Sequence, residues 1–294
     1  MMGLKTENVS PNIPKDKKLW RYMSLDKLIN LLDTKRLFFT PISSYANSDP
    51  FEGLLPKVAL DAISESSLGT YHSMLENRKK LRELILEKDP NFEENSPEIS
   101  KKLLEFEESL ENHLPKVEQS FFNVMNSIVV NCWHQNDDES EAMWRLYSDT
   151  NKGVAIQTTL EALTNSITDT KKDRIYFTEI KYIDFNDTTL KPSDCVVNRN
   201  IGPLLKRTAF SHEKEARLFF VPEKDYLNPE TSKPAHELVD IDLDTLIEKV
   251  YISPYASEPF PSSVECILKM FGLPDSKIVR SKLLTPNQNL LKLF

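Results

Sequence analysis

Glycine is scarce in this chain. Six glycines occur among 294 residues, at positions 3, 53, 69, 153, 202 and 272, and no two of them are close together. Doubly wound dinucleotide-binding folds and phosphate loops need clustered glycines, because their backbone must approach phosphate groups without an intervening Cβ atom. The scarcity excludes both motifs, so any bound nucleotide would be held by side chains on strands and helices.

Cysteines are few and long apolar runs are absent. The three cysteines, at positions 132, 195 and 266, are widely spaced and form no Cys-x-x-Cys pair, which predicts neither a disulfide framework nor a zinc knuckle. No apolar run is long enough to span a bilayer, and the N-terminus lacks the apolar core of a signal peptide. We therefore expect a cytoplasmic protein that does not contact membranes.

The chain also lacks an excess of positive charge. It has 37 Lys and Arg against 45 Asp and Glu, which gives a formal net charge of -8 and a sequence pI near 5.3. Bulk nucleic-acid binding needs a basic face that neutralises phosphates, so this class of protein is disfavoured. One or two local cations would still suffice to bind a small nucleotide.

The hydrophobic pattern predicts a short arm followed by one domain. Residues 1–17 are polar and contain two prolines, which predicts a flexible N-terminal arm. Residues 18–294 mix short strands and helices without regular alternation, which indicates a single α+β domain. We expect strands at residues 19–23, 37–40, 174–177, 180–183, 210–221, 246–252 and 277–283, and helices at residues 24–36, 161–167, 203–211 and 262–271.

A highly charged stretch at about residues 58–127 interrupts the predicted strands. Apolar residues recur there at helical spacing, and prolines at positions 90 and 97 break the pattern, so we expect a helical hairpin inserted into the domain. Such hairpins serve as scaffolding, as a lid or as an oligomer contact. The last use would make the protein a homo-oligomer through the helical insertion.

The segment from Cys132 to Tyr147 is unusually rich in tryptophan, carboxylates and other functional side chains. It predicts a strand, an acidic turn and a short helix, before a second strand near Gly153. Aromatic residues mixed this densely with carboxylates are typical of a cleft wall. The alternative is a helix that packs Met143 and Trp144 on the sheet while its charges face water. We expect Arg145 and Tyr147 to point elsewhere on the helix and to reach a cleft.

The sequence Glu213-Lys214-Glu215-Ala216-Arg217 is the second informative segment. Its alternation predicts a strand that places Glu213, Glu215 and Arg217 on one face. Carboxylates on adjacent same-face positions lie roughly 6–7 Å apart and repel. In a cleft, one glutamate would pair with Arg217 while the other would keep a raised pKa and take part in chemistry. The alternative is a solvated edge strand.

Signals for other chemistries are weak. His134 and His212 lie beside acidic residues but form no His-x-x-x-His pair, so we expect no metal. There is no Gly-x-Ser-x-Gly motif, and Cys132 lies in an apolar run, which favours a buried, inert thiol.

Four sequence motifs in series resemble those of a known family. They are Trp20-Arg21-Tyr22, the run from Leu37 to Glu52, Met143-Trp144 with Tyr147 before Lys152-Gly153-Val154, and His212-Glu213-Lys214-Glu215-Ala216-Arg217. Their order is similar to that in bacterial domain-of-unknown-function family 2971, over about residues 19–285.

The layout of that family is in turn similar to the ADP-ribosyltransferase fold. This resemblance implies a mixed, split sheet with surrounding helices, NAD as substrate, and either a small nucleotide or a macromolecule as acceptor. By position, Glu215 would be the catalytic carboxylate, with Glu213 two residues before it, stabilising positive charge as nicotinamide leaves. The implied cofactor-binding residues are Arg21 for the ribose or phosphates, Tyr22 or Tyr147 for stacking on nicotinamide, and Arg145 and Arg217.

Two alternatives remain open. The first is a non-catalytic nucleotide- or partner-binding sensing module, for example in phage defence. The second, less favoured, is a metal-dependent phosphodiesterase. Its ligands would be Asp49, Glu52, Glu139, Glu141 and His134, and the four carboxylates among them have no place in the transferase scheme. Otherwise these carboxylates would cap helices or pair with Arg21, Arg145 or Arg217.

Overall fold

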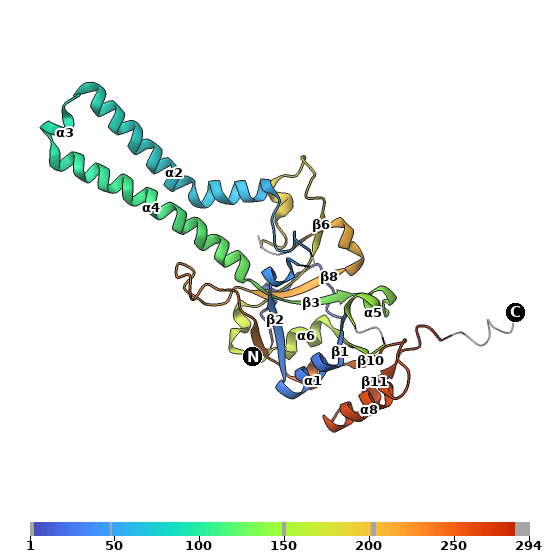
Figure 1. Ribbon diagram of the computed structural model, residues 1–294. Coiled ribbons are helices and arrows are strands. Elements are labelled where there is room, and N and C mark those ends of the chain that lie inside the picture. The colour runs from blue at the N-terminus through green and yellow to red at the C-terminus, as the bar shows by residue number, and fades with distance from the viewer. Residues whose placement is uncertain (1–2, 48, 149–150, 201–203, 286–294) are drawn as a thin grey trace.

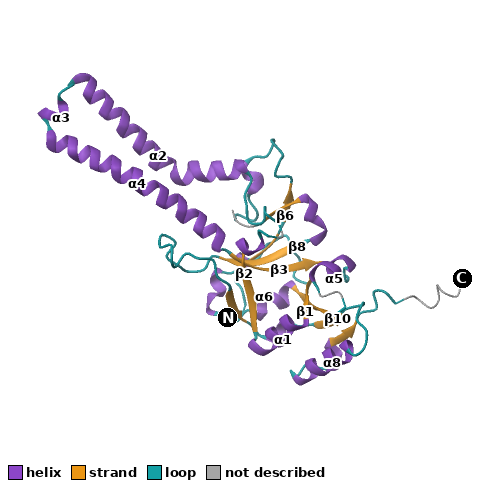
Figure 2. Cartoon of the chain, in the orientation of Figure 1, coloured by secondary structure: helices purple, strands orange, loops and turns teal. Residues whose placement is uncertain are grey.

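The computed structural model describes residues 3–47, 49–148, 151–200 and 204–285. Within these residues an open mixed sheet is surrounded by helices, and a long helical hairpin projects from one end (Figure 1). Strands and helices are interspersed along the chain rather than regularly alternating (Figure 2). The predicted α+β class is therefore confirmed.

The described residues form a nine-stranded main sheet and a separate pair of short strands. The main path runs β11-β10-β4-β1-β3-β2-β9, and β8 joins β3 to β5 beside this path. All pairings in the main sheet are antiparallel except that between β10 and β11. The strands are β1 (Lys18–Ser24), β2 (Arg36–Pro41), β3 (Val129–Gln135), β4 (Gly153–Thr159), β5 (Tyr176–Glu179), β8 (Glu215–Phe220), β9 (Glu237–Asp240), β10 (Lys249–Ile252) and β11 (Ile278–Arg280), with the parallel pair β6 (Lys181–Ile183) and β7 (Leu205–Arg207).

The sheet divides at β3. One edge of β3 pairs with β8 along the strand, from Val129 to His134. The other edge is shared, because β1 pairs with β3 only at Trp20 and Leu19, and β2 pairs with it only at Thr40 and Pro41. The strands β1 and β2 therefore diverge from opposite ends of β3. We call the space between them the sheet split.

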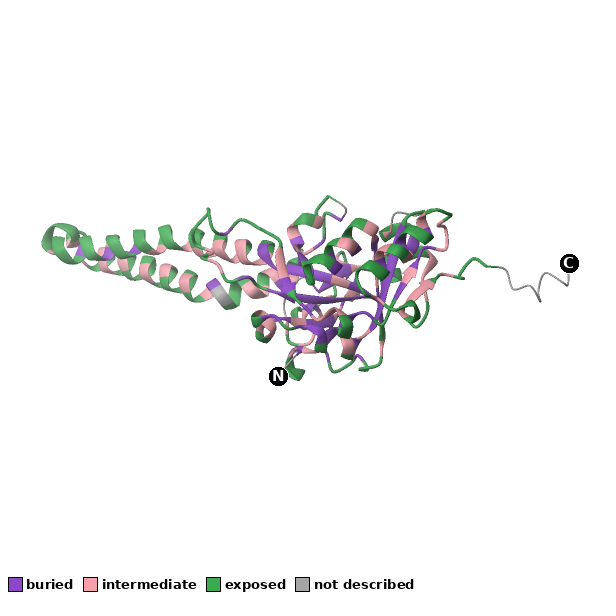
Figure 3. Ribbon diagram, turned by 90° about the horizontal axis from the view of Figure 1, so that it is seen from below, coloured by how far each residue is buried: buried purple, intermediate pink, exposed green. Residues whose placement is uncertain are grey.

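Amphipathic helices cover the sheet and close the main core. In α1 (Leu25–Thr34), the apolar residues Leu28, Leu31 and Leu32 recur at helical spacing and are buried against the strands. Lys35 ends this helix in the left-handed conformation. Buried residues concentrate in the sheet and on the helix faces toward it (Figure 3). The other helices around the sheet are α5 (Glu141–Tyr147), α6 (Leu160–Ser166), α7 (Leu243–Leu246) and α8 (Phe260–Met270).

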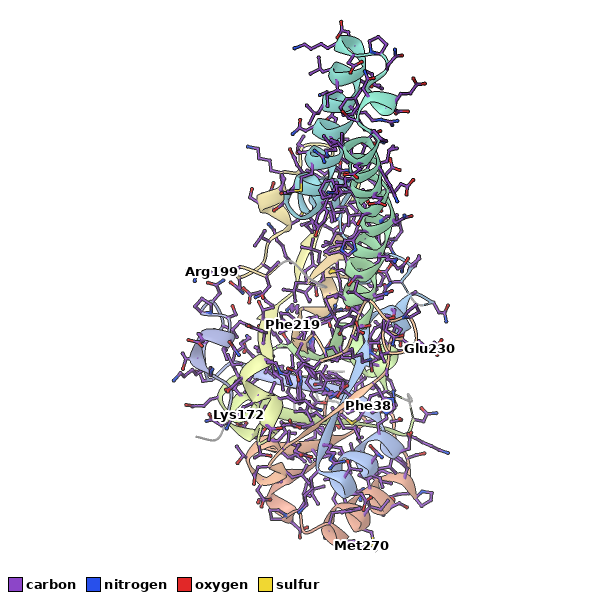
Figure 4. All side chains as sticks on the ribbon, turned by 90° about the vertical axis from the view of Figure 1, so that its left-hand side faces the viewer. Phe38, Lys172, Arg199, Phe219, Glu230 and Met270 are labelled. Carbon is purple, nitrogen blue, oxygen red and sulfur yellow. The ribbon has the colours of Figure 1, made fainter. Side chains whose placement is uncertain are left out.

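The helical hairpin consists of two long helices. They are α2 (Lys57–Lys88) and α4 (Pro97–Ser127), joined through the short α3 (Phe92–Asn95), where the charged stretch at about residues 58–127 was expected to be helical. At 1.5 Å per residue, α2 is about 48 Å long. Most of the hairpin surface is exposed, whereas its base meets the domain (Figure 3). Figure 4 shows the hairpin at the opposite end of the molecule from Met270 on α8.

Two local predictions differ from the structure. In the predicted flexible arm, residues 3–17 are packed onto the domain: the Gly3 amide donates to the Ile167 carbonyl at 3.0 Å, and Ile13 is buried in the core. Residues 1 and 2 lie outside the described residues. The predicted helix at residues 203–211 is wrong where it is described, because β7 is followed by a 3-10 helix, η5 (Thr208–Glu213). Three-residue strands such as β7 are too short to produce a recognisable period.

Candidate functional site

A cavity of about 290 Å³ lies beside the strands β1, β3 and β8. Residues from five parts of the chain line it, and both tryptophan-containing motifs of the sequence contribute. The lining includes Trp20, Arg21, Tyr22, Lys27, Tyr45, Asp49, Glu52, Cys132, Trp133, His134, Met143, Tyr147, Lys206, Phe210, Glu213, Glu215 and Arg217. Of the predicted site residues, only Arg145 is missing from this wall.

A buried group of five charged side chains forms one wall of the cavity. Lys206 on β7 contacts Glu213, lies 2.9 Å from Glu215, and lies 3.3 Å from Glu52. Arg217 on β8 contacts Glu215 on the same face of the strand and lies 2.7 Å from Glu52. We call these five residues the charge cluster. Three carboxylates and two basic groups give it a formal charge of minus one.

A sharp turn brings the two glutamates to the same lysine. Glu213 ends η5 rather than lying on the strand, and Lys214 has φ of 42°, in the left-handed region, before β8 begins at Glu215. The predicted strand over residues 210–221 is therefore correct only for its second half. The turn replaces simple alternation, yet both carboxylates still reach Lys206. The amide of Glu215 donates to the Tyr182 hydroxyl at 2.8 Å, which fixes the start of the strand.

The cations of the charge cluster keep Glu215 ionised. Burial raises the pKa of Glu215, but the charges of Arg217 and Lys206 outweigh burial and lower this pKa to about 2. Burial lowers the pKa of Lys206 and of Arg217, whereas the negative charge of Glu215 raises both above their ordinary values. Glu215 is therefore the glutamate that pairs with Arg217, as was predicted for one of the two. It lacks the proton of a general acid.

The loop after β2 supplies the third carboxylate. Asp49 and Glu52 are both buried, and Gly53 follows with φ of 76°. Asp49 accepts a hydrogen bond from Arg207 at 2.7 Å, so the loop is attached to the end of β7. Glu52 meets Lys206 and Arg217 in the charge cluster.

Arg21 lines the same cavity as the charge cluster but has a different environment. Its guanidinium is over the ring of Trp133, 5.9 Å from the ring centroid. The guanidinium itself makes no ion pair or hydrogen bond with any described residue. Burial lowers the pKa of Arg21, and its ionisable neighbours are Cys132 and Tyr45. Burial raises the pKa of both groups, that of Tyr45 to about 12, so neither is an anion at neutral pH.

A second cavity, of about 240 Å³, adjoins the first. The two share Arg21, Tyr22, Lys27 and Tyr45, so they meet at the side chain of Arg21. The second cavity occupies the sheet split, between residues of β1, α1 and β2. It is lined by Arg21, Tyr22, Met23, Lys27, Asn30, Leu31, Arg36, Phe38, Thr40 and Tyr45.

Two tyrosines predicted for the site also line the main cavity. The hydroxyl of Tyr22 accepts a hydrogen bond from the Ser140 amide at 2.8 Å, which connects β1 to the start of α5. The hydroxyl of Tyr147 donates to Glu213. Burial raises the pKa of both hydroxyls, and the negative charge of Glu213 adds to the shift at Tyr147, so both groups are neutral. Tyr147 keeps 46% of its surface exposed, which makes it the accessible partner of Glu213.

The short helix α5 orients its residues to two sides. Ser140 caps it by accepting from the Met143 amide, and Met143 and Trp144 are buried as predicted. Arg145, predicted to bind cofactor, instead pairs with Glu141 and lies over the ring of Tyr255, 5.1 Å from its centroid. A residue two positions before Tyr147 on a helix faces a different side, which explains why only one of them reaches the cavity.

The carboxylates of the phosphodiesterase alternative do not converge. Glu139 accepts from the indole of Trp144 at 3.0 Å, and Glu141 bonds to Tyr255, whereas Asp49 and Glu52 belong to the cavity wall. Among the described residues, no group of three or more His, Cys, Asp or Glu side chains could hold a metal ion. The five side chains named for that alternative therefore do not form one ligand set.

His134 also lies in the cavity wall, beside the charge cluster. Its Nδ1 donates to the Glu213 carbonyl, and burial lowers its pKa below the ordinary value. The neutral ring therefore helps to hold Glu213 in place. Cys132 lines the same cavity rather than lying wholly in the core as predicted, although its raised pKa keeps the thiol protonated.

The family comparison covers part of this site. Residues 143–218 match a protein-family model. Its description is Protein of unknown function (DUF2971). The DUF2971 match includes α5 from Met143 onward, β4 and the segment from Lys206 to Arg217, but it includes neither Arg21 nor Glu52. No curated protein and no solved structure matches the chain. The resemblance to this family is thus supported for the half of the site that carries Tyr147, Glu213 and Glu215.

Lys206, Tyr45 and Phe210 are cavity residues that the sequence did not indicate. Lys206 lies in a short strand with no distinctive neighbours, and only its three carboxylate partners reveal its position. The Phe210 ring lies 5.3 Å from the Lys206 ammonium. In the part of the chain that the structure describes, no helix is long and apolar enough to cross a membrane.

Proposed function

We propose that the main cavity binds NAD and that the protein cleaves its nicotinamide–ribose bond or transfers the ADP-ribosyl group to an acceptor. The observation that carries this proposal is that one cavity is lined both by a group of net negative charge and by a separate cation. The charge cluster has a formal charge of minus one, whereas Arg21 is a cation without a described partner. NAD has the matching polarity, with a cationic nicotinamide ring near its ribose and anionic phosphates beyond.

The chemistry would use this polarity. As nicotinamide leaves, positive charge develops on the ribose, and fixed carboxylates nearby stabilise that charge. Glu213 is the carboxylate that faces the ligand in this proposal, because its bond to the exposed Tyr147 is replaceable. Glu215 is held by Lys206 and Arg217 together, so its role is to position Glu213 and the two cations.

The test is to incubate purified protein with NAD, with and without a cellular protein fraction as acceptor, and to measure nicotinamide release by chromatography. Glu213→Gln should lower the rate by about 100-fold, because it removes one charge that stabilises the transition state. Glu223→Gln is the matched control, because Glu223 is exposed and pairs with Arg174, and neither of these residues lines the cavity. Absence of release under all conditions, or equal rates for both variants, would sink the proposal.

One observation favours a second function, a non-catalytic nucleotide-binding sensing module. Every carboxylate oxygen of Glu213 and Glu215 already has a hydrogen-bond partner. A protein of this kind would bind NAD without turnover, and ligand binding would raise the melting temperature by mass action. A melting shift that depends on NAD concentration, with no nicotinamide released, would decide for this second function over the first.

A further inference from the structure

His134 is a buried residue of the main cavity that uses only one of its ring nitrogens. It lies on β3, in register with Trp20 of β1 and with Glu215 of β8, so it is held between two neighbouring strands (Figure 1). Only 3% of its surface is exposed, and its Nδ1 donates to the Glu213 carbonyl. Burial lowers its pKa, so the ring is neutral and its hydrogen is on Nδ1. The second nitrogen, Nε2, therefore has a lone pair and no hydrogen.

Nε2 of His134 is a buried acceptor without a donor. It has no hydrogen-bond partner among the described residues. The Tyr22 ring packs edge-on against the imidazole, with ring centroids 6.2 Å apart, and helps to fix the ring plane. Leaving a buried acceptor unpaired is destabilising, and native proteins satisfy most such atoms. An unpaired lone pair in a cavity wall therefore indicates a place where a bound molecule supplies the donor.

The other ionisable groups of the cavity wall are poorly placed to take up a proton. Each of the four carboxylates already pairs with a lysine or an arginine, so a proton on any of them would break an ion pair. The three tyrosine hydroxyls and the Cys132 thiol already hold their protons, because burial raises the pKa of each. The lysines and arginines carry positive charge. Among the described residues of this wall, His134 is thus the base whose lone pair is free.

We propose that His134 is the general base that removes the proton of the ADP-ribosyl acceptor, and that the acceptor attacks through a neutral hydroxyl group, either of water or of a macromolecule. This inference rests on the proposed function. His134 bonds to the backbone of Glu213, the carboxylate that faces the ribose in that proposal, so the base and the carboxylate adjoin. Nε2 is covered by its neighbours, so the acceptor reaches it once the ligand has displaced the exposed Tyr147 from Glu213.

In this step one bond breaks and one bond forms at the C1′ atom of the ribose. The bond to the nicotinamide nitrogen breaks, and its electron pair neutralises the cationic ring, while the acceptor oxygen bonds to C1′. The proton of the acceptor passes to Nε2 of His134, and the resulting imidazolium releases it to water. Removal of this proton makes the oxygen a better nucleophile and leaves an uncharged oxygen in the product.

The experiment compares nicotinamide release by the native chain, His134→Asn and His212→Asn. The asparagine amide in the first variant can still donate to the Glu213 carbonyl, but it has no acceptor at the position of Nε2. His212 is the matched control, because it is an exposed histidine that lines neither cavity. Each protein is assayed with NAD alone, with an added protein fraction as acceptor, and with azide, an anionic nucleophile that has no proton to lose. We expect His134→Asn to lower release about 100-fold in the first two assays, and azide to raise it about tenfold in that variant, with His212→Asn unchanged.

A second readout, the tautomer of His134, does not depend on turnover. In protein with isotope-labelled histidine, nitrogen NMR at neutral pH should show the His134 signals, identified by their loss in His134→Asn, in the neutral Nδ1–H form. A ring that carries a proton on Nε2 would overturn the inference whatever the activity. Unchanged release in His134→Asn, or a loss that azide does not relieve, would also overturn it and would leave the NAD chemistry standing. If the native protein releases no nicotinamide, the proposed function fails and the general-base role fails with it.

Discussion

Lys206 is the residue on which the charge cluster depends. It contacts three buried carboxylates that come from the loop after β2, from η5 and from β8. Transfer of these carboxylates from water carries a large desolvation cost, which only close positive partners offset. Arg217 pairs with two of them, Glu215 and Glu52. The side chain of Glu213 is held by the Lys206 ammonium and the Tyr147 hydroxyl, and its backbone carbonyl accepts from His134.

Removal of that ammonium should destabilise the fold. We expect Lys206→Met to lower the free energy of unfolding by about 3–5 kcal/mol, because it removes the cation that pairs with the buried Glu213 and one of the two cations that pair with Glu52 and Glu215. Urea denaturation followed by circular dichroism measures this difference. Lys249→Gln, at an exposed lysine of β10, is the control and should change stability by less than about 0.5 kcal/mol. A loss in Lys206→Met no larger than in the control would contradict this account.

Acidification should also destabilise the fold through the charge cluster, by protonating Glu215. The pKa of Glu215 is about 2 in the folded protein, below its ordinary value of 4.5. The unfolded chain therefore binds a proton at higher pH than the folded chain does, and folding is favoured where Glu215 is ionised. Its stabilising contribution should be complete above pH 4.5 and should fall as pH drops toward 2. Urea midpoints measured across this range should fall steeply in the native protein and less steeply in Glu215→Gln.

At the scale of elements, local pattern accounts for some parts of the fold and tertiary contacts for others. The hairpin helices and α1 were predictable because apolar residues repeat at helical spacing over several turns. The turn at Lys214 was not predictable, because nothing in the alternating sequence distinguishes a lysine that adopts the left-handed conformation. The convergence of Arg21, Tyr147 and Glu213 could be expected only from the family resemblance. Arg145 was misplaced because helix orientation is set by packing.

The loop between β2 and α2 is an element with a strict backbone requirement. Gly53 has φ of 76°, and a Cβ atom there would lie 2.7 Å from Cγ1 of Ile42. We expect Gly53→Ala to cost about 2–4 kcal/mol of stability, through the left-handed backbone and the clash. Thermal unfolding measures the loss. The same change at Gly69, in α2 with no atom near its missing Cβ, should instead stabilise by up to about 1 kcal/mol. Equal effects at both glycines would contradict the structure.

At the scale of the whole molecule, the outer part of the helical hairpin, about residues 79–111, packs little against the domain. Along α4, the buried residues are only Ser100, Leu103, Glu107 and Ser127. Larger apolar side chains such as Leu84, Ile99 and Phe106 are exposed on the outer part of the hairpin. The outer hairpin therefore adds little to the core, and its apolar surface is the basis for the expected oligomer contact.

Shortening the hairpin should leave the domain folded. Lys79 on α2 pairs with Glu111 on α4 at 2.6 Å, so a short Gly-Ser linker in place of residues 79–111 would join neighbouring points. We expect the melting temperature to change by less than about 4 °C, which corresponds to roughly 1 kcal/mol. Sedimentation should show a smaller assembly if the hairpin carries the oligomer contact. A large fall in melting temperature would show that the hairpin stabilises the domain.

The charge cluster also constrains the order in which parts of the protein can fold during synthesis. Glu52 is distant along the chain from the other four members, and the neighbouring pair Asp49 and Arg207 is separated by 158 positions. Contacts of such long sequence separation form late in folding, after local helices and hairpins. During synthesis the first three quarters of the chain must wait for β8 to emerge from the ribosome. Until then Glu52 lacks Arg217, so a nascent chain cannot complete the charge cluster.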